Sequence, residues 1–90
     1  MGEQVDRATT EAQDAAIEAA VLAHLLAIHP TQLTAAELAR EVAGPEADFA
    51  ARDAIERAAR DLAGVGLLHR NGDLLTPSRA ALRCAELLDR

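Results

Sequence analysis

The sequence predicts a mainly helical domain with one small β-hairpin, in the order helix, helix, helix, hairpin, helix. Three observations lead to this fold class. Apolar residues recur at helical spacing over much of the chain. Several of these stretches begin with residues that cap helix N-termini. An Asn-Gly pair at 71–72 lies between two short apolar runs, which is typical of a hairpin turn.

The first helix is expected over about 14–28. Its apolar residues form one stripe at helical spacing, made of Ile17, Val21, Leu25 and Ile28. Leu22 and Leu26 form a second stripe about 100° away around the helix. This apolar surface is wider than one packing partner needs. We therefore expect Leu22 and Leu26, together with Leu87 near the C-terminus, to form the interface of a homodimer.

The second helix has the clearest start in the sequence. Thr34 and Glu37 make a capping box, in which each side chain accepts a hydrogen bond from the backbone amide of the other residue. Leu33 before the cap and Leu38 after it are placed to form a hydrophobic staple. The Gly-Pro pair at 44–45 ends this helix.

The third helix is expected after Asp48 as N-cap and runs to about Ala63. Gly64 or Gly66 supplies the left-handed residue that turns the chain away. The residues expected to face inward are Phe49, Ile55, Ala58, Ala59 and Leu62.

The hairpin pairs residues 67–70 with residues 73–76 around Asn71 and Gly72, both of which are expected at positive φ. The last helix is expected to open at Thr76 as N-cap, with Pro77 at the first helical position. Its inner stripe is expected to be Leu82, Ala85 and Leu88. Residues 1–11 are acidic and without a period, so we expect a flexible acidic N-terminal arm, followed by the domain itself over 12–90.

The net charge of −6 does not by itself indicate a nucleic-acid-binding protein. The charge is distributed unevenly, however. Residues 1–47 contain two Arg and eight acidic residues, whereas residues 48–90 contain seven of each. The half with the third helix and the hairpin is therefore far less acidic, as expected if nucleic acid touches this half. With a single cysteine and no visible signal peptide or membrane span, we expect a soluble, cytoplasmic protein.

The order of elements resembles that of the winged helix-turn-helix superfamily, particularly bacterial transcriptional regulators. The resemblance covers about 17–88 and rests on three stretches. These are Leu33-Thr34-Ala35-Ala36-Glu37-Leu38-Ala39, Ala58-Ala59-Arg60-Asp61-Leu62 running into Gly64-Val65-Gly66-Leu67-Leu68, and His69-Arg70-Asn71-Gly72-Asp73. The resemblance implies a third helix that enters the major groove of double-stranded DNA, a hairpin wing against the backbone, and a dimer on a palindrome.

The expected nucleic-acid-binding residues follow from the outward side of the third helix. Arg57 and Arg60 are assigned toward bases, and Arg52 and Arg70 toward phosphates, with Asn71 beside Arg70 at the wing tip. Asn71 has a competing explanation in turn chemistry alone. The arginines of the third helix also have a competing explanation, because acidic residues lie four positions away from them on the same helix. The possible pairs are Asp53–Arg57, Glu56–Arg60, Arg52–Glu56 and Arg57–Asp61, which makes a solvated, salt-bridged face the alternative.

The main hypothesis is thus a dimeric DNA-binding transcriptional regulator, and the alternative is a winged-helix module for protein–protein interaction that does not bind DNA. A third hypothesis, a regulator that senses an effector or redox change, rests on Cys84 and the histidines. We expect Cys84 to be a small core residue and His24 to be half-buried. No catalytic set, phosphate loop or metal motif occurs in the sequence, so we expect no enzyme activity, cofactor, metal or small-molecule ligand.

Overall fold

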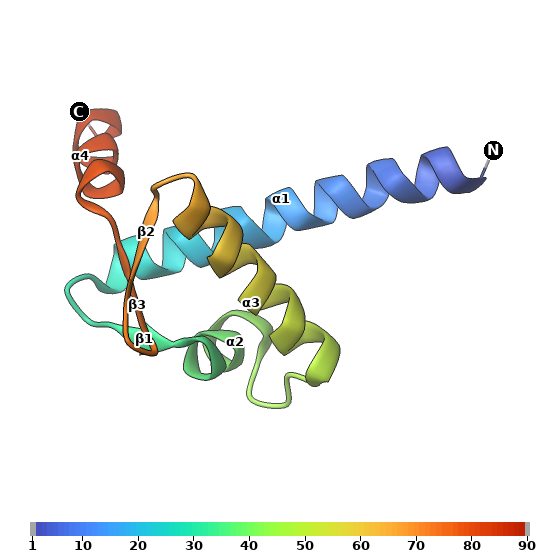
Figure 1. Ribbon diagram of the computed structural model, residues 1–90, viewed down its shortest axis with the longest axis horizontal. Coiled ribbons are helices and arrows are strands. Elements are labelled where there is room, and N and C mark those ends of the chain that lie inside the picture. The colour runs from blue at the N-terminus through green and yellow to red at the C-terminus, as the bar shows by residue number, and fades with distance from the viewer. Residues whose placement is uncertain (1, 90) are drawn as a thin grey trace.

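In the computed structural model of the chain, the backbone of residues 2–89 and the side chains of residues 10–89 are described (Figure 1). Within this range the chain forms four helices and a small antiparallel sheet. The elements are α1 (Gly2–Ile28), β1 (Leu33–Thr34), α2 (Ala35–Ala43), α3 (Phe49–Gly64), β2 (Leu68–Asn71), β3 (Leu74–Pro77) and α4 (Arg79–Leu88). The predicted class, mainly helical with a small β-hairpin, is confirmed, and the arrangement is compatible with the predicted element order.

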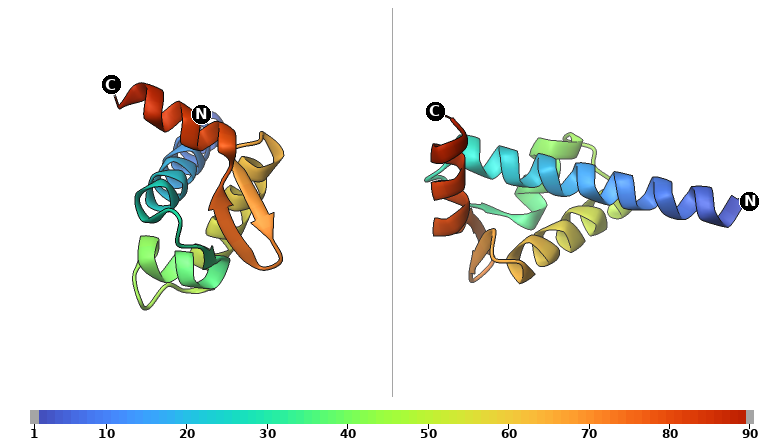
Figure 2. Two further views of the ribbon diagram at one scale, coloured as in Figure 1. Left: turned by 90° about the vertical axis from the view of Figure 1, so that its left-hand side faces the viewer. Right: turned by 90° about the horizontal axis from the view of Figure 1, so that it is seen from above.

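Helix α1 is longer than the sequence analysis expected, because it begins at Gly2 and not near Asp14. Its first turns extend beyond the other elements (Figures 1 and 2). The segment lacks an apolar period but contains no proline and many strong helix formers, so intrinsic propensity favours a helix there without a buried face. The flexibility expected for residues 1–11 stays a prediction.

Helix α2 begins as predicted. The Thr34 hydroxyl accepts a hydrogen bond from the Glu37 amide at 3.2 Å, and the Glu37 carboxylate accepts one from the Thr34 amide at 2.9 Å. Leu33 and Thr34 also form β1, which pairs with β3 in a sheet of order β1-β3-β2. A two-residue strand has too little local pattern to be recognised in a sequence.

Helix α3 begins after Asp48, whose side chain accepts a hydrogen bond from the Ala51 amide at 2.8 Å, as predicted. Four of its five expected inward residues are buried, namely Ile55, Ala58, Ala59 and Leu62. The fifth expectation is wrong, because Phe49 is 82% exposed. At 100° per residue Phe49 lies about 120° from Ile55, so the helix turns it away from the core. Of the two glycines considered, Gly66 has the positive φ, at 86°.

The core lies where the C-terminal half of α1 meets α2, α3 and the sheet (Figure 2). Its fully buried large side chains are Val21, Leu25, Leu38 and Leu75. These four come from α1, α2 and β3, so the domain is held together by contacts between segments far apart in sequence. Burial of such side chains is the main favourable term in folding.

The hairpin β2–β3 forms as predicted, but its turn is shifted by one residue. Asn71 pairs with Leu74 in the ladder, so Gly72 and Asp73 are the two loop residues. Gly72 has φ 65°, and no other residue type in the described chain has a positive φ. A glycine at the first loop position suits a type II′ turn, in which only that position needs positive φ. The expected positive φ at Asn71 is therefore wrong.

Helix α4 begins later than expected. Thr76 and Pro77 belong to β3, and Ser78 is the N-cap, with its hydroxyl accepting from the Ala81 amide at 3.1 Å. The Ser78 amide itself donates to the Leu67 carbonyl at 2.9 Å, so the hairpin pairing continues past the expected cap. The expected inner stripe is only partly correct, because Ala81 is the buried residue of α4 and Leu88 is 81% exposed. None of the helices within residues 2–89 combines the length and apolar character that crossing a bilayer requires.

Candidate nucleic-acid interface

The outer face of α3 is defined here by Phe49, Asp53, Glu56 and Arg60, which follow one another at helical spacing on the side away from Ile55. The start of α2 borders this face on one flank, and α1 borders the opposite flank. The hairpin β2–β3 reaches it through Arg70, which bonds Glu56. Three elements thus meet along one exposed side of α3.

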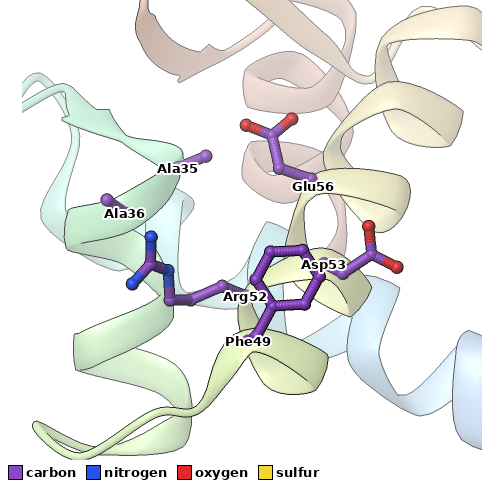
Figure 3. A pocket seen from close by; sticks show the side chains of 6 residues that line it. All are labelled: Ala35, Ala36, Phe49, Arg52, Asp53 and Glu56. Carbon is purple, nitrogen blue, oxygen red and sulfur yellow. The ribbon is translucent and has the colours of Figure 1, made fainter.

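Arg52 lies on the flank toward α2. A hollow of about 250 Å³ separates the start of α2 from α3, and its lining residues are Ala35, Ala36, Phe49, Arg52, Asp53 and Glu56 (Figure 3). Figure 3 shows the guanidinium group of Arg52 extending toward α2, whereas the carboxylate of Asp53 points the other way. Arg52 therefore places its cation at the hollow, whose other charged lining residue besides Asp53 is Glu56.

Arg57 lies on the opposite flank, toward α1. It lines a smaller hollow with Asp14, Glu18 and Asp61, and its Nε atom is 3.5 Å from Oδ2 of Asp53. The helix thus separates Arg52, which was assigned toward phosphates, from Arg57, which was assigned toward bases. Because acids surround Arg57, its charge is already offset on this side of the molecule.

The expected salt-bridged face forms only in part. Of the four pairs considered, Asp53–Arg57 is present, and Glu56 pairs instead with Arg70 of the hairpin, at 3.2 Å between Oε2 and Nη2. Within residues 10–89, Arg52 and Arg60 have no acidic partner within 4.0 Å. The third helix therefore presents two unpaired cations eight residues apart, a separation of about 12 Å along the axis.

Asn71 follows Arg70 at the end of β2 and is exposed, paired across the ladder with Leu74. Its position beside the turn is thus explained by strand pairing, and its side chain remains free to contact a ligand. Arg70 keeps 41% of its side-chain surface exposed in spite of its bond to Glu56. A partly exposed ion pair of this kind contributes only about 0–1 kcal/mol, so a competing anion can displace it.

Arg40 on α2 belongs to the same charged region and was missed by the sequence analysis. It lines a further hollow of about 260 Å³ with Pro45, Ala47 and Arg52, so two arginines from different helices face one space. The spacing within α2 gave no signal for this, because the partner Arg52 comes from α3. Phe49 was also missed, although its angle from Ile55 around the helix already placed it outside the core.

A second surface lies between α1 and α4. Ala23, Leu26, Ala27, Leu82, Ala85 and Leu88 supply apolar lining to an open groove of about 730 Å³, whose remaining lining residues are His29, Glu86 and Asp89. Leu87 is half-exposed beside it, and Leu22 packs against the core. Cys84 is exposed on α4, so its expected place in the core is wrong. The apolar residues Leu82, Ala85 and Leu88 of α4 line the groove, whereas Cys84 does not.

Two polar contacts involve α2, one with α1 and one at its own N-terminus. His24 on α1 is half-buried, as expected, and its Nε2 atom lies 2.6 Å from Oε1 of Glu41 on α2. At the start of α2, the hydrogen bonds from Thr34, first from its amide and then from its side chain, hold the pKa of Glu37 below its ordinary value. The lowered pKa means that the capping box favours the ionised form of Glu37.

Comparisons of this chain with models of protein families, with curated proteins and with solved structures found no match.

Proposed function

We propose that this chain is a winged helix-turn-helix protein that binds double-stranded DNA as a dimeric transcriptional regulator. Helix α3 enters the major groove, the hairpin β2–β3 acts as the wing, and the start of α2 lies against the backbone. The observation that carries the proposal is the contiguous exposed side of α3, where Arg52 and Arg60 stand without acidic partners among the described side chains.

The roles of the arginines follow from their positions. Arg60 on the outer face is directed toward base edges, and Arg52, together with Arg40 across the hollow, is directed toward phosphates. Arg70 reaches the backbone from the wing once a phosphate displaces Glu56, and Asn71 lies beside it. Arg57 contributes least, because it lies on the flank toward α1 among acidic side chains.

The acidic side chains of α3 do not prevent such binding. Without DNA, Asp53 and Glu56 are each paired with an arginine, and Glu56 is left unpaired only when a phosphate takes Arg70 from it. The acidic residues of α1 that border α3, Asp14 and Glu18, line the flank toward Arg57 and not the hollow that Arg52 lines.

The proposal is tested by fluorescence-anisotropy titration of a randomised duplex pool at about 50 and about 200 mM salt. Binding that weakens steeply with salt supports it, because each phosphate contact adds about 0.9 to the slope of log K against log salt. The Arg52→Ala/Arg60→Ala double variant is expected to lose affinity and slope. The matched control is Arg79→Ala/Arg83→Ala, which removes the same charge from α4. Equal losses in the two variants, or no binding at either salt, would contradict the proposal.

A protein-docking module is the second candidate. Its specific support is the 82% exposed ring of Phe49 beside the methyl groups of Ala35 and Ala36, because an exposed aromatic with apolar neighbours is common in protein interfaces. If the duplex pool does not bind, this candidate is the one to pursue, by crosslinking from a photoreactive residue at position 49.

The homodimer is part of the main proposal. Its interface is the groove between α1 and α4, with Leu26 and Leu88 in the lining and Leu87 beside it. An interface of this kind pairs the same patch on both copies, so each copy covers the apolar groove of the other. Leu22, the other residue of the expected interface, is partly buried against the core and does not line this groove.

A further inference from the structure

We propose that Phe49 reads thymine, by contact of its ring with the 5-methyl group in the major groove. This inference rests on the proposed DNA binding and names the base that the start of α3 selects. The observation behind it is an exposed aromatic ring that shares one hollow with the methyl groups of Ala35 and Ala36 (Figure 3).

Phe49 is the only aromatic side chain of the types Phe, Trp and Tyr in the sequence, and it is 82% exposed. Large apolar side chains usually contribute most to a core, and this domain has few of them. Its place is set by the Asp48 cap, which fixes the first turn of α3 and holds the ring on the outer face. The ring is therefore presented to solvent by a rigid element and not by a loose loop.

The hollow beside Phe49 combines apolar and hydrogen-bonding groups. The methyl groups of Ala35 and Ala36 stand opposite the ring, and the guanidinium of Arg52 extends across toward α2 (Figure 3). Its volume of about 250 Å³ exceeds that of several water molecules, each of which occupies about 30 Å³ in the liquid. A projecting methyl group and the adjacent oxygen of a base edge fit in such a space.

Thymine is the base whose major-groove edge offers an apolar group to this aromatic and methyl surface. It presents a 5-methyl group next to the O4 acceptor, whereas cytosine presents an amino donor and no methyl group. Phe49 and the alanines suit this methyl group, while Arg52 beside them stays directed toward phosphate. The residues at the start of a recognition helix are those that meet base edges in this class of fold.

The test compares thymine with uracil, which differ only by the 5-methyl group. A preferred site is selected from the duplex pool, and its thymines are replaced by uracil one position at a time. The wild-type protein is expected to bind about fourfold more weakly at one position, the effect of losing one buried methyl group. Phe49→Ala is expected to bind the thymine and uracil duplexes equally, with the salt slope unchanged because no charge is altered.

Val65→Ala is the matched control, since Val65 is also an exposed apolar residue but lies at the other end of α3. This variant is expected to keep the preference for thymine. Equal binding of thymine and uracil duplexes by the wild type at every position would overturn the inference while leaving DNA binding intact. So would a thymine preference that survives in Phe49→Ala. No binding of any duplex overturns the proposed function itself, and with it the inference.

Discussion

Glu56 on α3 and Arg70 on β2 are joined by a hydrogen bond of 3.2 Å between opposite charges, and this bond ties the hairpin to the outer face of the helix. The two residues are 14 positions apart in the sequence. Because both side chains remain partly exposed, the pair is one that water or a phosphate can replace. It thus holds Arg70 near the proposed DNA surface while reducing its charge there.

Replacing Glu56 by glutamine is expected to strengthen DNA binding. The change releases Arg70 and removes an acidic charge from the outer face, so affinity should rise roughly fivefold, which corresponds to about 1 kcal/mol for a partly exposed pair. The salt slope should steepen by about 0.9 if Arg70 gains one phosphate contact. Anisotropy titration over a series of salt concentrations measures both quantities.

The control for this prediction is Glu86→Gln. Glu86 pairs with Arg83 at 3.1 Å on α4, so the substitution frees an arginine and changes net charge equally, but away from α3. Because Glu86 also lines the groove between α1 and α4, the sedimentation mass of this variant is measured alongside its affinity. Its effect on affinity should be small. The same gain from both variants would mean that net charge alone, and not the position of Arg70, controls binding.

Removal of the Thr34 cap is expected to destabilise the domain. In Thr34→Ala the Glu37 amide loses the hydroxyl that accepts its hydrogen bond, which costs about 1 kcal/mol of the free energy of unfolding. Thr31→Ala is the matched control, because Thr31 is exposed in the loop before β1. Its free energy of unfolding should stay within about 0.5 kcal/mol of the wild type. Urea unfolding followed by circular dichroism measures both, and equal midpoints for the two variants would refute the cap's contribution.

The ionisation of Glu37 is expected to make stability depend on pH. Its pKa in the folded chain lies below the ordinary value of 4.5, so its stabilising contribution is complete above pH 4.5 and is lost as the pH falls through the lower, folded pKa. Glu37→Gln keeps an acceptor for the Thr34 amide but has no such titration. Below pH 4.5 the wild type should therefore lose free energy of unfolding relative to the variant. Parallel stability curves for the two proteins across that range would show that the capping carboxylate is not the titrating group.

Dimerisation through the groove between α1 and α4 is expected to depend on Leu88. The wild-type chain should sediment at about twice its mass of 9.5 kDa at micromolar concentration. Leu88→Glu places a charge in the apolar groove and should give the monomer, without loss of fold because the side chain is 81% exposed. Val65→Glu adds the same charge at an exposed site outside the groove and should leave the dimer intact. A wild type that sediments at 9.5 kDa would exclude this interface.

Features set by neighbouring residues were predicted well. The Thr34 and Asp48 caps, the inward face of α3 at Ile55 and Leu62, and the presence of the hairpin all depend on interactions within a few residues. Such interactions leave a direct trace in the order of residue types. The start of α1 was not predicted, because the segment has no apolar period and helix propensity alone extends the helix there.

Features set by distant residues were not predicted. Pairing of Leu33 with Leu75 forms β1. Pairing of His69 with Thr76 keeps Thr76 in β3, so that Ser78 is the N-cap of α4. In each pair, the residues near one strand do not indicate which residue of the other strand it will face. The turn at Gly72 follows in the same way from the register of the two strands, which only the assembled sheet determines.

The candidate site likewise has features that depend on neighbouring residues and features that depend on distant ones. The amino-acid sequence by itself determined which segments are helical, which helix has an exposed charged face, and that Arg52, Arg60 and Arg70 lie in the less acidic half of the chain. The tertiary structure decided which charges neutralise one another, because Glu56 has potential partners both on its own helix and on the hairpin, and packing brings Arg70 to it. It also separated Arg57 from Arg52, brought Arg40 beside Arg52, and left Phe49 in solvent, since each of these depends on which element packs against each flank of α3.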